Sequence, residues 1–174
     1  EDMRLVVEFA RASRREMMHR TLEAIQGLTR DLDVDTAMTG VADINHNYVD
    51  REEHLGESLF VHRKGAIRVG LGETGFVPGS MGTSSYVVQG RGNEIAFCSC
   101  AHGGGRTMSR AEASRTVTRK DYEQSLRDVI CAHSEVLLDE APEAYKDIKV
   151  VMRGQSDLVK TLFELHPVLS MKGR

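Results

Sequence analysis

Two glycine-rich stretches decide how this sequence is organised: PGSMGTSS at residues 78–85 and AHGGGR at residues 101–106. A strand is expected between them at 85–89, where SYVVQ is rich in aromatic and β-branched residues. Glycines and small hydroxyl residues let backbone N–H groups come close to an anion. The second stretch adds an imidazole, His102, and a guanidinium, Arg106, that could hold a phosphate with two parallel hydrogen bonds. Each stretch alone is weak evidence for a site, because glycine most often serves only to turn the chain.

The centre of the chain around these loops is rich in predicted strands, and both ends are helical. Apolar residues at three-, four- and seven-residue steps predict an amphipathic helix over 2–28. A β-hairpin is expected where 59–62 and 66–69 flank Gly65, because glycine suits a tight turn. The other predicted elements are a strand at 37–49, helices at 109–114, 119–133 and 155–165, and a closing strand at 167–171. This arrangement predicts an α+β fold, with helices around a strand-rich centre.

Length and composition predict one soluble domain. The 174 residues are 40% hydrophobic and 28% charged, which is enough to bury a core. No apolar run of about 18 residues is present, so no membrane span is expected, and the first residues lack the features of a secretory signal. Three cysteines make no disulfide framework, which favours a reducing, cytoplasmic location. The chain begins at Glu1 inside a predicted helix, and we expect it to be a piece of a longer protein.

Charge is unevenly distributed along the chain. The net charge of −3 excludes a uniformly basic nucleic-acid binder. The segment 106–120 nevertheless carries five Lys and Arg residues against one Glu. It is either a solvated helix face or a strip that binds a phosphate backbone beside His102. Its position next to a candidate nucleophile favours the second interpretation.

Other candidate residues are less informative on their own. His46 lies between two asparagines after a predicted strand, and a metal site there would need further ligands that the nearby sequence does not supply. Cys98 and Cys100 could suggest a soft metal site, but no second pair of cysteines exists. We therefore expect two small buried thiols. Spacing assigns no role to the remaining histidines, which are His19, His54, His62, His133 and His166.

The order of the motifs resembles the C-terminal half of the RtcB-type RNA ligases. The matching segments run from about 45 to 173: HNYV at 46–49, RKGA at 63–66, PGSMG at 78–82, AHGGGR at 101–106, MSR at 108–110, AYKDI at 144–148 and MKG at 171–173. The resemblance implies a GTP- and Mn²⁺-dependent enzyme that joins an RNA 3′-phosphate or 2′,3′-cyclic phosphate to a 5′-hydroxyl. Its partners would be RNA, such as tRNA halves or broken RNA, and an activating protein.

The same resemblance implies roles for individual residues. His102 matches the histidine that attacks GTP and becomes guanylylated, chemistry that suits an unprotonated imidazole. His46 matches one Mn²⁺ ligand. The residues expected to contact the nucleotide are Ser80, Ser85, Gly104, Tyr145 and Lys172, and those expected to hold RNA or triphosphate are Arg106 and Arg110.

The sequence also departs from the family pattern. Gly104 stands where the common loop has Ala, and the Asp-x-x-Cys-Gly and Gly-Asn-His-Phe-like motifs of the N-terminal half are absent. The resemblance thus implies that residues 1–174 are the C-terminal portion of a single catalytic domain, inactive when isolated. The alternative is a catalytically silent fragment that binds nucleotide or RNA, or half of a split enzyme. A weaker alternative is a metal-dependent phosphohydrolase that uses His46 and neighbouring Asp or Glu residues.

Overall fold

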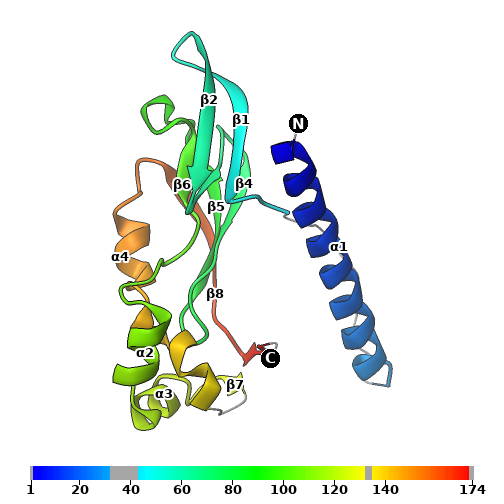
Figure 1. Cartoon of the computed structure of the whole chain (residues 1–174), viewed down its shortest axis with the longest axis vertical. Helices are drawn as coiled ribbons and strands as arrows, with labels where there is room; N and C mark the ends of the chain where they lie inside the picture. Colours follow the sequence, from blue (N-terminus) through cyan, green and yellow to red (C-terminus); the bar gives the residue numbers. More distant parts are fainter. Residues whose placement is uncertain (1, 32–42, 132–134, 173–174) are drawn as a thin grey trace.

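The computed structural model describes residues 2–31, 43–131 and 135–172, and it confirms the predicted α+β class (Figure 1). The chain begins with one long helix, α1 (Asp2–Thr29), and its strands then fill the middle of the sequence. The further helices are α2 (Arg110–Thr116), α3 (Arg119–Ser125) and α4 (Ile148–Arg153), with short 3-10 turns η1 (Glu94–Ala96), η2 (Glu135–Glu140) and η3 (Pro142–Ala144).

The strands form four small sheets. The first is an antiparallel hairpin of β1 (Asn47–His54) and β2 (Glu57–Lys64), and the second pairs β3 (Ala66–Arg68) with β6 (Ser99–Ala101). The third sheet is antiparallel and has the order β4 (Thr74–Val77), β5 (Ser85–Gly90), β8 (Val159–Leu165). The fourth pairs β7 (Ile130–Cys131) with β9 (Leu169–Ser170) in parallel. Figure 1 shows the β1–β2 hairpin at one end of the strand-bearing body and α2 and α3 at the other.

The described residues form two hydrophobic clusters, one on each side of the loop that contains PGSMG. The first is formed mainly by the sheets and α4, and includes Val77, Val88 and Ile148. The second is formed by the small helices and includes Met81, Tyr122 and Leu126. The loop that contains PGSMG joins them, because Val77 before it is fully buried in one cluster and Met81 within it is buried in the other. The loop is thus fixed at both sides.

Helix α1 lies beside this body and is largely exposed (Figure 1). Arg14 connects it to the body, because its Nε donates to Asp43 Oδ1 at 2.7 Å and its Nη2 donates to Asn45 Oδ1 at 2.5 Å. Large apolar side chains such as Leu5, Phe9 and Leu28 remain in solvent. No helix in the described part of the chain is long and apolar enough to cross a bilayer.

The predicted hairpin around Gly65 is wrong. Strand β2 pairs with the preceding strand, β1, through a turn at Leu55 and Gly56, whereas β3 pairs with β6. Gly65 has a φ of +75° and forms the junction between two sheets rather than the tip of a hairpin. The glycine is needed for its backbone conformation, as expected, but in a different connection.

The predicted helix at 155–165 is wrong, and the one predicted at 119–133 is shorter than expected. The segment 155–165 contains strand β8, which pairs with β5, and the helix of this region, α4, comes earlier at Ile148–Arg153. The helix expected at 119–133 ends at Ser125. The predicted strand at 37–49 falls largely on residues outside the described ranges, and β1 begins only at Asn47. The helix over 2–28 and the strand at 85–89 are confirmed.

Candidate active site

His102 follows β6 and is oriented by the backbone of Gly65. Its Nδ1 lies 2.7 Å from the Gly65 carbonyl oxygen, and its own N–H donates to the same oxygen at 3.4 Å. A carbonyl oxygen only accepts hydrogen bonds, so the neutral ring must carry its proton on Nδ1. The lone pair is then on Nε2, for which the described residues provide no hydrogen-bond donor. For the neutral ring, the fold therefore selects the tautomer whose basic nitrogen, Nε2, is free to react.

His46 stacks against His102. The ring centroids are 5.3 Å apart and the planes are inclined by 13°. The same junction positions both residues, because the Gly65 N–H donates to the His46 carbonyl at 3.2 Å. Partial loss of hydration, together with the nearby His102 and Arg14, lowers the pKa of His46 below its ordinary value of 6.5. His46 is thus kept neutral, which is the form in which an imidazole binds a metal.

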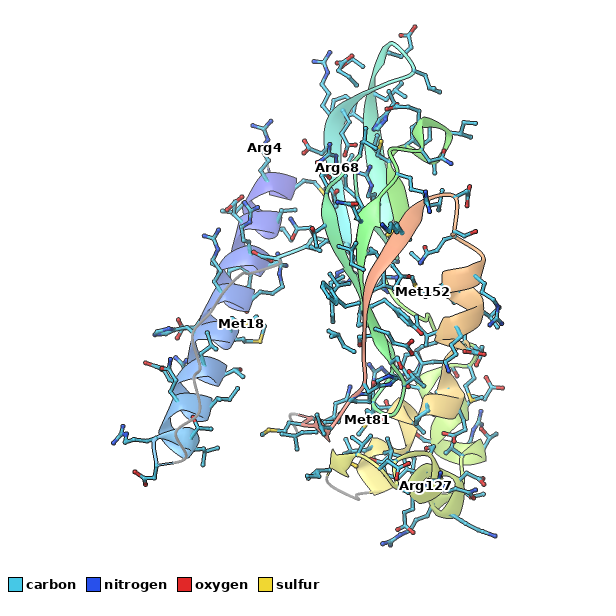
Figure 2. All side chains as sticks on the ribbon, turned by 180° about the vertical axis from the view of Figure 1, so that it is seen from behind. Arg4, Met18, Arg68, Met81, Arg127 and Met152 are labelled. Carbon is cyan, nitrogen blue, oxygen red and sulfur yellow. The ribbon has the colours of Figure 1, made fainter. Side chains whose placement is uncertain are left out.

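The two histidines line a hollow of about 660 Å³ between α1 and the sheets. Its apolar lining includes Met18, Ile44 and Phe76, and Arg14 and Asp43 supply charge. Figure 2 shows Met18 extending from α1 toward the strand-bearing body. This hollow is large enough to hold a ligand of nucleotide size beside His102.

A second hollow, of about 220 Å³, brings together three of the five residues predicted to contact a nucleotide: Ser80, Tyr145 and Lys172. Glu140 also lines it and accepts hydrogen bonds from Tyr145 Oη at 2.7 Å and Lys172 Nζ at 3.3 Å. Burial alone would raise the pKa of Glu140, but these two donors and the charge of Arg110 lower it below 4.5. Pro78 lines the first hollow and Gly79 the second, so the PGSMG loop borders both.

The other two predicted nucleotide residues help to shape the loops. Ser85 Oγ accepts the Gly79 N–H at 3.1 Å. Gly104 passes close to the backbone of Lys146, because a Cβ at Gly104 would lie 3.3 Å from that residue's carbonyl oxygen. Neither Ser85 nor Gly104 lines the second hollow. Contact of either residue with a nucleotide stays a prediction.

The two arginines predicted to bind RNA already have partners in the described structure. Arg106 donates to Tyr145 Oη at 3.1 Å and to the Asp139 carbonyl at 2.6 Å, and its guanidinium lies 5.0 Å from the centre of the Tyr145 ring. Arg110 pairs with Asp139 at 2.5 Å and with Glu140. Two acidic residues thus offset part of the basic strip. The side chain of Arg110 is still 68% exposed, whereas that of Arg106 is 24% exposed.

Sequence reasoning missed two residues of this region and one cluster outside it. Gly65 and Glu140 stand out only once the chain is folded, since their role is to hold other candidate residues in place. A group of three potential metal ligands, His54, Glu94 and Cys98, has ligand atoms within 4.8 Å of one another. Among the described residues, no such group surrounds His46.

An α+β protein that presents a histidine with a free Nε2 in a glycine-rich loop, beside a large hollow, has the features of a nucleophile site for phosphate chemistry. The tRNA-splicing ligase RtcB family matches residues 1–173, and the chain belongs to this family. It is 42% identical over 167 residues to the RNA-splicing ligase RtcB of Escherichia coli strain K12, covering 95% of this chain and 41% of the relative.

Archaeal relatives are more distant. The tRNA-splicing ligase RtcB of Methanococcus maripaludis is 33% identical over 166 residues, covering 82% of this chain and 35% of the relative. That of Archaeoglobus fulgidus is 35% identical over 178 residues, covering 88% and 36% respectively. The chain therefore spans 35–41% of the length of these three relatives, and the resemblance noted in the sequence is confirmed at the level of the family.

Proposed function

We propose that this chain takes part in RNA ligation, joining RNA 3′-phosphate or 2′,3′-cyclic phosphate ends to 5′-hydroxyl ends through a GMP group carried on His102. The observation that supports it is the hydrogen bond from His102 Nδ1 to the Gly65 carbonyl, which leaves Nε2 as the nucleophile beside a large hollow. The names of the relatives, which are RNA-splicing and tRNA-splicing ligases, support RNA as the substrate.

Three transfers would follow from this geometry. His102 Nε2 attacks the α-phosphorus of GTP, so that a P–N bond forms and pyrophosphate leaves. An oxygen of the RNA 3′-phosphate then attacks the same phosphorus, which transfers GMP to the RNA and restores the imidazole. Finally, the 5′-hydroxyl oxygen attacks the RNA 3′-phosphate, loses its proton and displaces GMP. Ser80, Tyr145 and Lys172 are proposed to contact the nucleotide, and Arg106 and Arg110 to contact RNA or triphosphate.

Mn²⁺ is part of what the family resemblance implies, and the described residues fit it only in part. His46 supplies one neutral imidazole, but no group of three His, Cys, Asp or Glu ligand atoms surrounds it in the described ranges. A single ligand does not hold such an ion tightly. We therefore assign His46 as one ligand of a site completed by other residues, and no step above is carried by the metal.

The incomplete ligand set favours a second proposal. The chain alone would be catalytically silent, binding nucleotide or RNA and completing an active site only with the part of its relatives that it does not match. The two proposals agree on the role of His102 and differ on what the isolated chain can do.

Labelled GTP and Mn²⁺ test both proposals. The chain would be incubated alone and after mixing with the unmatched portion of the Escherichia coli relative, and acid-labile label on the chain would be measured. We expect label in the mixture and none with His102→Ala, whereas a variant at the exposed His62, His62→Ala, should label normally. Label that survives His102→Ala would refute the nucleophile. Labelling or ligation by the chain alone would refute the silent-fragment proposal.

A further inference from the structure

A cluster of histidine, glutamate and cysteine lies where the β1–β2 hairpin meets η1, away from the hollow that His46 and His102 line. His54 ends β1, Glu94 begins η1 and Cys98 follows η1. The His54 Nδ1 lies 3.1 Å from Glu94 Oε2, and Cys98 Sγ lies 3.7 Å from Glu94 Oε1. From these contacts we propose that His54, Glu94 and Cys98 form a Zn²⁺-binding site.

The spacing of the three donor atoms suits tetrahedral zinc. Zinc binds imidazole nitrogen and carboxylate oxygen at about 2.0–2.2 Å and thiolate sulfur at about 2.3 Å, so neighbouring ligand atoms are separated by about 3.3–3.7 Å. The two contacts of Glu94, at 3.1 and 3.7 Å, involve different oxygens of its carboxylate. With one ligand atom taken from each residue, the three atoms lie within 4.8 Å of one another, so a bound ion would draw them slightly closer together. Three protein ligands leave a fourth position for water, and the 51% exposure of the Glu94 side chain gives solvent access to it.

The second nitrogen of His54 is already held in the way that zinc-binding histidines usually are. Nε2 lies 2.8 Å from Glu52 Oε2, so the ring can donate its proton there and present the lone pair of Nδ1 to a metal. Glu52 is in turn paired with the buried guanidinium of Arg63. His54 is only 4% exposed, so this chain of contacts fixes the ring. A neutral ring oriented by a carboxylate is the arrangement that raises the affinity of a histidine for zinc.

The cysteine of the cluster lies in a strained segment of backbone. Phe97 and Cys98 are consecutive non-glycine residues with φ of +49° and +47°. This conformation is unfavourable for residues with a Cβ, and surrounding contacts must maintain it. One of these is the hydrogen bond from Arg63 Nη2 to the Phe97 carbonyl at 2.7 Å. The same arginine thus supports both the histidine and the cysteine of the cluster.

The donor set distinguishes zinc from the harder cations. Sulfur, nitrogen and oxygen together suit Zn²⁺, whereas Ca²⁺, Mg²⁺ and Mn²⁺ prefer oxygen-rich sites. Burial and the Glu94 carboxylate raise the pKa of the Cys98 thiol, and a bound dication would reverse that effect and release the proton. With thiolate and carboxylate ligands the two negative charges balance the ion, and Glu52 is balanced by Arg63.

Co²⁺ in place of Zn²⁺ gives a test that is specific for the thiolate. The purified, untagged and metal-free chain would be titrated with Co²⁺, and charge-transfer absorption from thiolate to cobalt would be recorded, followed by displacement with Zn²⁺. Histidines elsewhere, including His46 and His102, do not produce this absorption. We expect the band in the wild-type chain, its loss in Cys98→Ser and its retention in Cys100→Ser. Cys100 is a matched buried thiol, and burial raises its pKa to about 12.

Two substitutions of glutamate, one in the cluster and one outside it, keep the proposal testable if Cys98→Ser does not fold. Glu94→Gln should weaken Zn²⁺ binding by at least about tenfold, measured by competition with a chromophoric chelator, and the exposed Glu53→Gln should stay within about twofold of wild type. Absence of the cobalt–thiolate band in the folded wild-type chain would overturn the proposal. Persistence of the band in Cys98→Ser, its loss in Cys100→Ser, or equal affinities of Glu94→Gln and wild type would do so as well.

Discussion

Two histidines of this chain are held in opposite ways. His54 contacts carboxylates through both ring nitrogens, and the nearest of these is fixed by Arg63. His102 is oriented by one backbone carbonyl, that of Gly65, and its second nitrogen is left free. The first environment stabilises a positive charge or a cation, whereas the second selects the tautomer of the neutral ring that leaves Nε2 free. The chemistry of an imidazole in this chain thus depends on whether charged side chains or a backbone carbonyl position it.

The largest effect is expected at Arg63, which holds the charged environment together. The side chain is 2% exposed and donates to Ser99, Tyr48, Glu52 and the Phe97 carbonyl. Arg63→Met removes the buried guanidinium that pairs with Glu52, which keeps only His54 and Arg68 among the described residues, and it should lower the free energy of unfolding by about 3–5 kcal/mol in urea titrations. The control is Arg51→Met, since Arg51 is an exposed residue of β1, and should stay within about 0.5 kcal/mol. Equal effects of the two changes would show that charge does not hold this region.

The next largest effect is expected at Gly65, whose backbone carbonyl orients His102. Gly65 has a φ of +75°, and a Cβ there would make only ordinary 3.6 Å contacts with His102. Gly65→Ala should therefore lower the free energy of unfolding by about 1–2 kcal/mol, because the left-handed conformation disfavours a Cβ. Any relaxation of this strain moves the carbonyl that orients His102, so guanylylation in the reconstituted mixture should fall as well.

A matched glycine separates strain from catalysis. Gly56 has a φ of +80° and open space around its Cβ position, and it lies in the β1–β2 turn. Gly56→Ala should have a similar cost in stability in the same urea titration, but it should leave labelling of His102 unchanged. If both variants label equally well, the Gly65 carbonyl is not what orients the nucleophile.

These two environments also show what the sequence could and could not predict. The glycine-rich loops pointed to His102, and the apolar pattern of 85–89 predicted β5, because both signals are local. Gly65 was correctly seen as a turning point but was assigned to the wrong connection. A glycine with positive φ suits a hairpin and a junction between sheets equally, and only the distant partners β1 and β6 decide between them.

The cluster of His54, Glu94 and Cys98 could not be predicted from the sequence for a similar reason. His54 and Glu94 are forty residues apart, so no spacing brings them together before the strands pair. Cys98 was grouped with Cys100 because they are neighbours in sequence, yet its contact is with Glu94. Strand β8 was predicted as a helix because VKTLFEL has no strong preference of its own, and its pairing with β5 determines its conformation.

Tyr145 is held both by charged side chains and by contact with the face of its aromatic ring. Arg106 covers one face of its ring at 5.0 Å, and its hydroxyl donates to Glu140. If the other face stacks on guanine, Tyr145→Ala should raise the KM for GTP in the reconstituted mixture by at least about fivefold, since stacking of a base on an aromatic side chain contributes about 1–3 kcal/mol. Tyr145→Phe keeps the ring and should change KM by less than about threefold. Equal losses in both variants would assign the role to the hydroxyl and its ion-pair network instead.

The smallest effect, and the most direct test of the comparison, is the pH dependence of the two kinds of histidine environment. The hydrogen bond that His54 donates to Glu52, and further contacts with Glu94, raise the pKa of His54 above 6.5 although burial opposes this. His46, beside His102, has a pKa below 6.5. In metal-free protein, NMR titration of the imidazole resonances should give midpoints on opposite sides of the value measured for the urea-unfolded chain.

The contributions of His54 and His46 to the free energy of unfolding should also depend on pH in opposite directions. The contribution of His54 is fully present below pH 6.5 and is lost as the pH rises through its raised pKa, because the folded state binds the proton more tightly. The contribution of His46 is present above pH 6.5 and is lost as the pH falls through its lowered pKa, because the unfolded state binds the proton more tightly. His54→Gln should flatten the stability curve above pH 6.5, and His46→Gln should flatten it below. If both substitutions flatten the same side, the two imidazoles are not distinguished by the groups that hold them.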